Sequence, residues 1–201
     1  MKIVCATGNS HKVDEFNMLL DPMSTDLEFE ILGAQVLGGM PEVDEDADSF
    51  YGNARLKADA LWELASRIGA WVLSDDSGLA VDALQGAPGV YSARYAGPDA
   101  SDSENVGKLL NALQGVSQNK RSAKFVCSLC LIDPAGTLFA ADGYCSGIIA
   151  NEPRGNHGFG YDPVFIPRGY QETFGELGSS IKRELSHRAE ALQNLVRQLR
   201  V

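Results

Sequence analysis

Residues 1–20, MKIVCATGNSHKVDEFNMLL, contain the pattern that decides the fold class of this chain. Lys2 to Ala6 form a short apolar run, which predicts a buried strand. Thr7 to Ser10 are typical of a turn, and apolar residues recur at helical spacing from His11 to Leu20. A strand, a tight turn and a helix in direct succession indicate the opening of an α/β fold.

The rest of the chain continues this alternation and adds a hairpin. Pro134-Ala135-Gly136 separates two long apolar runs, which predicts antiparallel strands at 125–133 and 137–149. Ser101 or Ser103 could cap a helix that ends near Leu113. The other expected elements are strands at 27–32, 70–73 and 79–83, and helices at 50–68 and 185–199. Together they predict an α/β fold with a mixed sheet.

Charge and composition restrict the class of protein. The 201 residues carry 17 Lys and Arg against 27 Asp and Glu, which gives a net charge of −10. This balance argues against a long contact with DNA or RNA, although a small polyanion could bind at a local group of basic residues or a metal ion. Four cysteines make no disulfide framework, and no apolar run suits a membrane span or a signal peptide. We therefore expect a soluble, cytoplasmic protein with no nucleic-acid or membrane partner.

The turn at residues 7–12 is the first candidate site. A glycine-containing turn that opens a helix presents backbone N–H groups and the positive end of the helix dipole, where phosphates bind. Lys12 adds a positive charge, and the spacing differs from that of a Walker A loop. An ordinary junction between a strand and a helix is the alternative.

Two adjacent aspartates form the second candidate site. Asp75 and Asp76 follow the strand expected at 70–73, and carboxylates at a strand end suit metal binding and water activation. The acidic run from Glu42 to Asp48 could lend one more carboxylate to the same metal. A solvated acidic turn and a solvated loop are the alternatives.

Lys57 is the third candidate, because it shares the apolar stripe of the expected helix 50–68 with Ala54 and Leu61. A lysine in such a stripe either extends its ammonium group to water along an apolar surface or directs it into a polar cleft.

A glycine-rich loop at residues 155–160 is the fourth candidate. Its glycines allow the backbone to approach a ligand closely. Phe159 and Tyr161 could stack on a base, and Asp162 could accept a hydrogen bond from a ring N–H. A flexible loop with core aromatics is the alternative.

A basic segment is the fifth candidate. Lys182, Arg183, His187 and Arg188 are expected at the amino terminus of the last helix, where the helix dipole disfavours positive charge. That cost suggests an anionic or acceptor-rich partner, and an ordinary basic surface is the alternative.

The histidines and cysteines show no spacing that is typical of a metal site. The three histidines lack metal-ligand spacing, and Cys127 and Cys130 fall in an expected strand, where they point to opposite faces and belong to the core. With carboxylates as the available ligands, Mg²⁺ is the natural candidate cation.

Six stretches of the chain form a set that continues from the first strand to the last helix. In chain order they are Ala6-Thr7-Gly8-Asn9-x-x-Lys12-x-x-Glu15-Phe16, Ser49-Phe50-x-x-Asn53-Ala54-x-x-Lys57-Ala58, Ser74-Asp75-Asp76-Ser77-Gly78-Leu79-x-Val81-Asp82, Gly86-Ala87-Pro88-Gly89-Val90-Tyr91-Ser92-Ala93-Arg94-Tyr95, Gly158-Phe159-Gly160-Tyr161-Asp162-Pro163, and Lys182 followed by Ser186-His187-Arg188. Together these stretches resemble the inosine triphosphate pyrophosphatase family, whose members hydrolyse non-canonical purine nucleoside triphosphates.

The resemblance implies an elongated mixed β-sheet with two α/β lobes and a central substrate cleft, in one domain over residues 1–201. It implies Mg²⁺-dependent hydrolysis of ITP, dITP and XTP to the monophosphate and pyrophosphate by a homodimer. It assigns Asp76 as the proton acceptor and, with Glu45, as a metal ligand. The residues that it assigns to the substrate are Thr7, Gly8, Asn9, Ser10, His11, Lys12, Lys57, Ser77, Phe159, Gly160, Tyr161, Asp162, Lys182, His187 and Arg188.

Within that assignment we place Arg188 at the purine end, where it would donate to the oxygen at position 6. Gly52 departs from the family pattern, which usually has Glu there, and Asn156-His157 replaces small residues. Two other functions stay open at this point. One is a Mg²⁺-dependent hydrolase of modified pyrimidine triphosphates, and the other is a non-enzymatic nucleotide-binding module.

Overall fold

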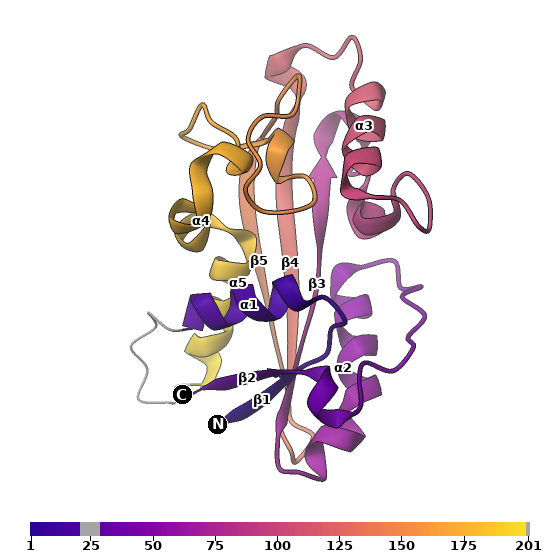
Figure 1. The fold of residues 1–201 in the computed structure, drawn as a ribbon, viewed down its shortest axis with the longest axis vertical. Helices are drawn as coiled ribbons and strands as arrows, with labels where there is room; N and C mark the ends of the chain where they lie inside the picture. Colours follow the sequence, from indigo (N-terminus) through magenta and orange to yellow (C-terminus); the bar gives the residue numbers. More distant parts are fainter. Residues whose placement is uncertain (21–28, 200–201) are drawn as a thin grey trace. The chain divides into compact units, whose positions relative to one another are not determined.

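The computed structural model describes residues 1–20 and 29–199, which form two compact units (Figure 1). Unit 1 comprises Met1–Asp76, Cys127–Gly143 and Arg188–Val201, and unit 2 comprises Ser77–Val126 and Tyr144–His187. The helices are α1 (Ser10–Leu20), α2 (Phe50–Ser66), α3 (Asp102–Ala112), α4 (Phe174–Leu185) and α5 (His187–Leu199).

Six strands form one sheet in the order β2-β1-β3-β4-β5-β6. Strand β1 pairs in parallel with β2 and β3, whereas β5 and β6 are antiparallel, so the predicted mixed sheet is confirmed. The strands are β1 (Lys2–Cys5), β2 (Glu30–Gly33), β3 (Trp71–Val81), β4 (Ser122–Ile132), β5 (Leu138–Ile149) and β6 (Phe165–Pro167).

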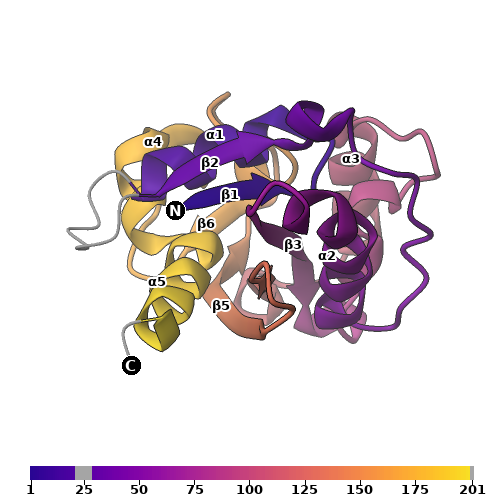
Figure 2. The same cartoon turned by 90° about the horizontal axis from the view of Figure 1, so that it is seen from below.

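The sheet of unit 1 is covered on both faces. Figure 2 shows α2 and α5 on opposite sides of the strands. On one face, α1 and α5 pack Phe16 and Leu192 against β1, β3 and β4, and on the other, α2 packs Ala58 and Leu61 against Val4 and Val72. Cys127 and Cys130 lie in these two opposite cores, both buried and unbonded, as the strand period predicts.

The core of unit 2 lies on one face of the same strands. It is built from β3, β4, β5, helix α3 and three phenylalanines whose rings pack together, Phe125, Phe165 and Phe174. Ser101 caps α3 and forms a capping box with Glu104, which confirms one of the two predicted caps. Among the residues that the structure describes, no helix has the length and apolar character needed to cross a membrane.

The predicted elements differ from the observed ones in three respects. The strand predicted at 70–73 runs on without a break to Val81, so Ser74–Gly78 is not a turn. Helix α4 and the short strand β6 were not predicted. The strand predicted at 27–32 is present as β2 from Glu30, and its first two residues lie outside the described part of the chain.

Candidate functional site

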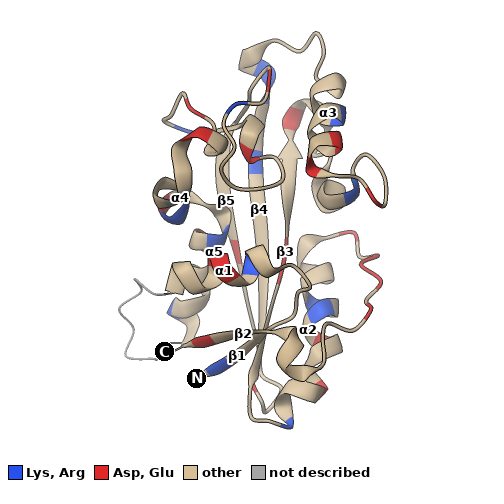
Figure 3. Cartoon of the chain, viewed as in Figure 1, with Lys and Arg blue, Asp and Glu red and all other residues tan. Residues whose placement is uncertain are grey.

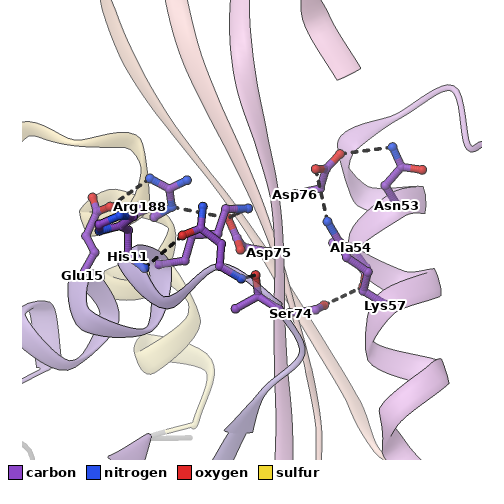
Figure 4. A network of polar contacts seen from close by, with 12 residues as sticks. His11, Glu15, Asn53, Ala54, Lys57, Ser74, Asp75, Asp76 and Arg188 are labelled. Carbon is purple, nitrogen blue, oxygen red and sulfur yellow. Dashed lines mark hydrogen bonds and ion pairs between the residues drawn. The ribbon is translucent and has the colours of Figure 1, made fainter. Parts of the chain in front are cut away.

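Asp75 and Asp76 lie in the middle of β3, so their side chains point to opposite faces of the sheet (Figure 4). Both are buried, with relative exposures of 0% and 8%. The sequence predicted that these two carboxylates lie at a strand end, where they would suit metal binding. Their predicted place at the strand end is wrong, because β3 continues to Val81, and the pleat of the strand gives each aspartate a separate set of partners.

Asp75 faces α1 and α5, where two cations meet it. Lys12 Nζ lies 3.0 Å and Arg188 Nε 3.4 Å from Asp75 Oδ2, and Arg188 Nη1 lies 3.0 Å from Glu15 Oε2. Burial alone would raise the pKa of Asp75, but Lys12 and Arg188 hold it well below its usual range. Asp75 is therefore a charged, fixed anchor for both cations.

Asp76 faces α2, where a second set of groups meets it. Lys57 Nζ lies 3.3 Å from Asp76 Oδ1 and 2.7 Å from Glu45 Oε2, and Asn53 Nδ2 donates to Asp76 Oδ2 at 3.2 Å. Lys57 thus directs its ammonium group to carboxylates rather than to water. Burial raises the pKa of Asp76, although Lys57 opposes the shift. Burial would lower the pKa of Lys57, but Asp76 and the other carboxylates raise it.

Glu45 is positioned by the acidic loop that precedes α2, which Figure 3 shows as a run of acidic residues. The Ala47 N–H donates to Asn53 Oδ1 at 3.0 Å and fastens this loop to the helix. A Cβ at Gly52 would lie 2.6 Å from the Cβ of Ala47 and 3.0 Å from Ser49 Oγ. Gly52 therefore allows the loop to pack closely on the first turn of α2.

The predicted turn before α1 is confirmed. The Asn9 N–H donates to Thr7 Oγ1 at 3.1 Å, and the His11 N–H donates to Asn9 Oδ1 at 2.9 Å. Asn9 thus caps the helix, which begins at Ser10. The stretch from Gly8 to His11 is exposed. This turn is an accessible helix amino terminus that can receive an anion beside Lys12.

A second group of predicted site residues lies in unit 2. Asp162 Oδ2 accepts hydrogen bonds from Lys182 Nζ at 2.6 Å and from the Phe159 N–H at 2.9 Å. Lys182 Nζ also lies 4.6 Å from the centre of the Phe159 ring. Phe159, Asp162 and Lys182, which we call the Phe159 group, combine an aromatic face, a carboxylate acceptor and an ammonium donor, which suits recognition of a heterocyclic base.

Other contacts hold the same loop. The Gly160 N–H donates to Asp102 Oδ2 at 2.6 Å, and the buried Tyr161 hydroxyl donates to the Ser92 carbonyl at 2.9 Å. Burial raises the pKa of Tyr161. The predicted site residue His187 stacks on Phe125, with ring centres 4.8 Å apart. Tyr161 and His187 are therefore built into the core of unit 2.

The basic segment differs from its prediction. Lys182 and Arg183 lie in the last turn of α4, where positive charge is favourable, and only His187 and Arg188 open α5. Arg188 is 2% exposed and pairs with Glu15 and Asp75 in unit 1 rather than with the Phe159 group. Ser77 is half-buried on β3, directly after Asp76.

Three polar residues that the sequence analysis gave no role take part in these groups: Asn53, Glu15 and Asp102. The first two carry a helical signal. Asn53 lies one turn before Lys57 on the same helix face, and Glu15 lies three residues after Lys12. No local pattern marks Asp102, because its partner Gly160 is distant in the sequence.

Comparison with known proteins confirms the resemblance that the six stretches carry. A dITP/XTP pyrophosphatase of Opitutus terrae is 48% identical over 197 residues, which cover 97% of each chain, and one of Rhodopirellula baltica is 46% identical over 198 residues, 98% of this chain and 92% of the relative. A solved HAM1 protein from Coxiella burnetii superposes with a TM-score of 0.84 at 39% identity and covers 99% of this chain and 98% of that chain.

A second solved structure, the Ham1 protein of Staphylococcus aureus, has a TM-score of 0.83 at 36% identity and covers 100% of this chain and 98% of its own. The model of the Ham1 family matches residues 3–198, from the first strand to the last helix. The matched range includes the turn at residues 7–12, the buried aspartates and the Phe159 group, and this chain belongs to the Ham1 family.

Proposed function

We propose that this protein hydrolyses the non-canonical purine nucleoside triphosphates ITP, dITP and XTP to the monophosphate and pyrophosphate, with Mg²⁺. The observation that carries the proposal is Asp76, a buried carboxylate on β3 that contacts Lys57 and Asn53. Relatives that match nearly the whole chain are named dITP/XTP pyrophosphatases. The homodimer and the cytoplasmic location stay predictions.

The carboxylates present fit a divalent cation. Glu45 and Asp76 already hold a positive group, the Lys57 ammonium, between their oxygens. Among the described residues no group of three or more Asp, Glu, His or Cys side chains is arranged to hold a metal. Mg²⁺ takes one or two carboxylates and completes its shell with water and substrate phosphates. Glu45 and Asp76 would be its protein ligands.

The residues of unit 1 divide the chemistry among them. The Asn9 and His11 N–H groups donate within the turn, so the Gly8 and Ser10 N–H groups and the Lys12 ammonium bind the triphosphate and offset its charge. When bound, Mg²⁺ neutralises phosphate charge and lowers the pKa of coordinated water. Asp76 accepts a proton from the water that attacks the α-phosphorus, and the bond from that phosphorus to the pyrophosphate oxygen breaks.

The Phe159 group would select the base. Inosine and xanthine carry an oxygen at position 6, where adenine carries an amino group. Lys182 can donate to that oxygen but not to the amino group. One N–H of its ammonium donates to Asp162, and a further N–H that ATP leaves without an acceptor costs about 1–3 kcal/mol. The Phe159 and Gly160 N–H groups already donate to aspartates, so Lys182 takes the role that the sequence analysis gave to Arg188.

Release of pyrophosphate from a panel of ITP, dITP, XTP, ATP and a modified pyrimidine triphosphate tests the proposal. We expect release from ITP, dITP and XTP at least ten times faster than from ATP, and only with Mg²⁺. Equal rates for the pyrimidine substrate, or release of inorganic phosphate instead, would contradict the proposed substrate class or reaction.

Replacement of Lys57 by Met should lower kcat/KM for ITP at least tenfold. Met retains the packing of the stem on α2 but removes the charge that both carboxylates contact. The control is Arg67→Met, an exposed cation just beyond the end of the same helix. An unchanged kcat/KM in Lys57→Met would show that the ammonium serves only the fold.

A further inference from the structure

Unit 2 contains a cavity of about 510 Å³ that none of the groups described above uses. It lies on strands β4, β5 and β6, and its polar lining includes Lys124, Ser146, Arg168 and Asp82. The volume falls within the roughly 300–1,000 Å³ that small-molecule sites occupy.

The cavity lies on the face of the sheet opposite to the core of unit 2. Along β4, Ala123 and Phe125 point into that core, so Ser122 and Lys124 point the other way, and Lys124 is exposed. Along β5, Cys145 and Ile149 point into the core, so Ser146 and Ile148 share the face of Lys124.

Strand register joins these positions into two rows. The Ile149 N–H donates to the Arg121 carbonyl at 2.9 Å, and at the other end of the hairpin the Asp133 N–H donates to the Thr137 carbonyl at 3.0 Å. Both bonds belong to one antiparallel register, in which Lys124 lies opposite Ser146.

The third strand extends both rows. Ile148 pairs with Ile166, and the Arg168 N–H donates to the Ser146 carbonyl at 2.9 Å. The first row is therefore Lys124, Ser146 and Arg168, and the second is Ser122, Ile148 and Ile166. One row is polar and cationic, and its neighbour is largely apolar.

The cationic row is unusual in a chain of net charge −10. Lys124 and Arg168 stand two strand spacings apart, about 10 Å between their backbones, with a hydroxyl between them. Neither forms an ion pair with any carboxylate in the described part of the chain, and Lys124 Nζ lies 5.4 Å from the ring of Tyr144. Asp82 is the one acid in the lining, so the cavity has a net positive charge.

We propose that this cavity is a second binding site, for a small organic phosphate. The phosphoryl group lies over Ser146, where Lys124, Arg168 and the Ser146 hydroxyl all donate to it. The apolar or aromatic part of the ligand lies on Ile148 and Ile166. A nucleoside monophosphate has both parts and a matching size. This site belongs to unit 2 alone and does not rest on the proposed hydrolysis.

Titration of the ¹⁵N-labelled full chain with inosine 5′-monophosphate, followed by amide chemical shifts, tests the proposal. We expect saturable shifts at Ser146, Gly147 and Gly169, separate from any shifts at residues 7–12. Lys124→Gln and Arg168→Gln should each weaken binding at this cavity at least tenfold. Both side chains are exposed, so neither substitution should disturb the fold. The matched control is Lys120→Gln, an exposed lysine of unit 2 outside the lining, which should bind as the wild type does.

Three results would overturn the proposal. They are the absence of shifts at the cavity, shifts confined to residues 7–12, and equal affinity in the wild type and both cavity variants. Inorganic phosphate alone should shift the same amides but bind at least tenfold more weakly, because it has no part to lie on the isoleucines. Equal binding of phosphate and the nucleotide would contradict the role of Ile148 and Ile166.

Discussion

Replacement of Asp76 by Asn should nearly abolish pyrophosphate release from ITP, by a factor of about 10²–10⁴. The amide cannot accept the proton of the attacking water, and it is a poor ligand for Mg²⁺. Asn has the same shape as Asp and can still contact Asn53, so the fold should stay intact. The rate of pyrophosphate release measures the loss of activity, and the thermal melting temperature of the same preparation shows whether the fold is intact.

The matched control for this variant is Asp46→Asn. Asp46 is an exposed carboxylate next to Glu45 in the acidic loop, and its loss changes the net charge by the same amount. Its activity should stay within a factor of two of the wild type. If Asp76→Asn retained more than a tenth of the wild-type rate, Asp76 would not be the base.

Replacement of Arg188 by Ala should have the largest effect on stability, a loss of about 3–5 kcal/mol in the free energy of unfolding. The guanidinium lies 3.0 Å from Glu15 and 3.4 Å from Asp75, and its side chain is 3% exposed. Its removal takes away the guanidinium that contacts both buried carboxylates, although Asp75 keeps its contact with the Lys12 ammonium. Urea unfolding of the wild type and the variant measures the loss.

Arg183→Ala is the control, since Arg183 is exposed in α4 and its loss should cost little. Adding Glu15→Gln to Arg188→Ala should recover part of the stability, because one uncompensated charge is removed. The sequence instead predicts a role for Arg188 in base selection. Unchanged stability together with a loss of preference for ITP over ATP would restore that role and contradict the structural one.

The sequence correctly predicted the parts of the fold that are determined by interactions between residues close together in the chain. The turn at residues 7–12, the Ser101 cap and the hairpin at Pro134-Ala135-Gly136 each follow from dihedral preferences and hydrogen bonds within a few residues. For the same reason the apolar stripe placed Lys57 correctly on the inner face of α2.

The failures concern residues whose partners are distant in the sequence. Ser74–Gly78 has the composition of a turn, yet it continues β3 because Ala54, Lys12, Arg188 and Lys57 satisfy its buried polar side chains. Such distant partners cannot be identified from the sequence alone, and their contacts override the local preference of this segment for a turn. Gly178, with φ at 73°, interrupts the helical periodicity of the apolar residues in α4, so this helix was not predicted. Lys182 and Arg183 were therefore expected at the start of the last helix, whereas they lie at the end of α4.

The close packing at Gly52 has a consequence for how this protein can be recombined with others. A Cβ at this position would lie 2.6 Å from the Cβ of Ala47. The residues at positions 47 and 52 must therefore be compatible in size. A chimaera that takes α2 from a protein with a side chain at position 52 must take the preceding loop as well. The segment from residue 45 to residue 66 is therefore the smallest piece that contains α2 whole together with Glu45, the attachment of the loop to Asn53, and Lys57.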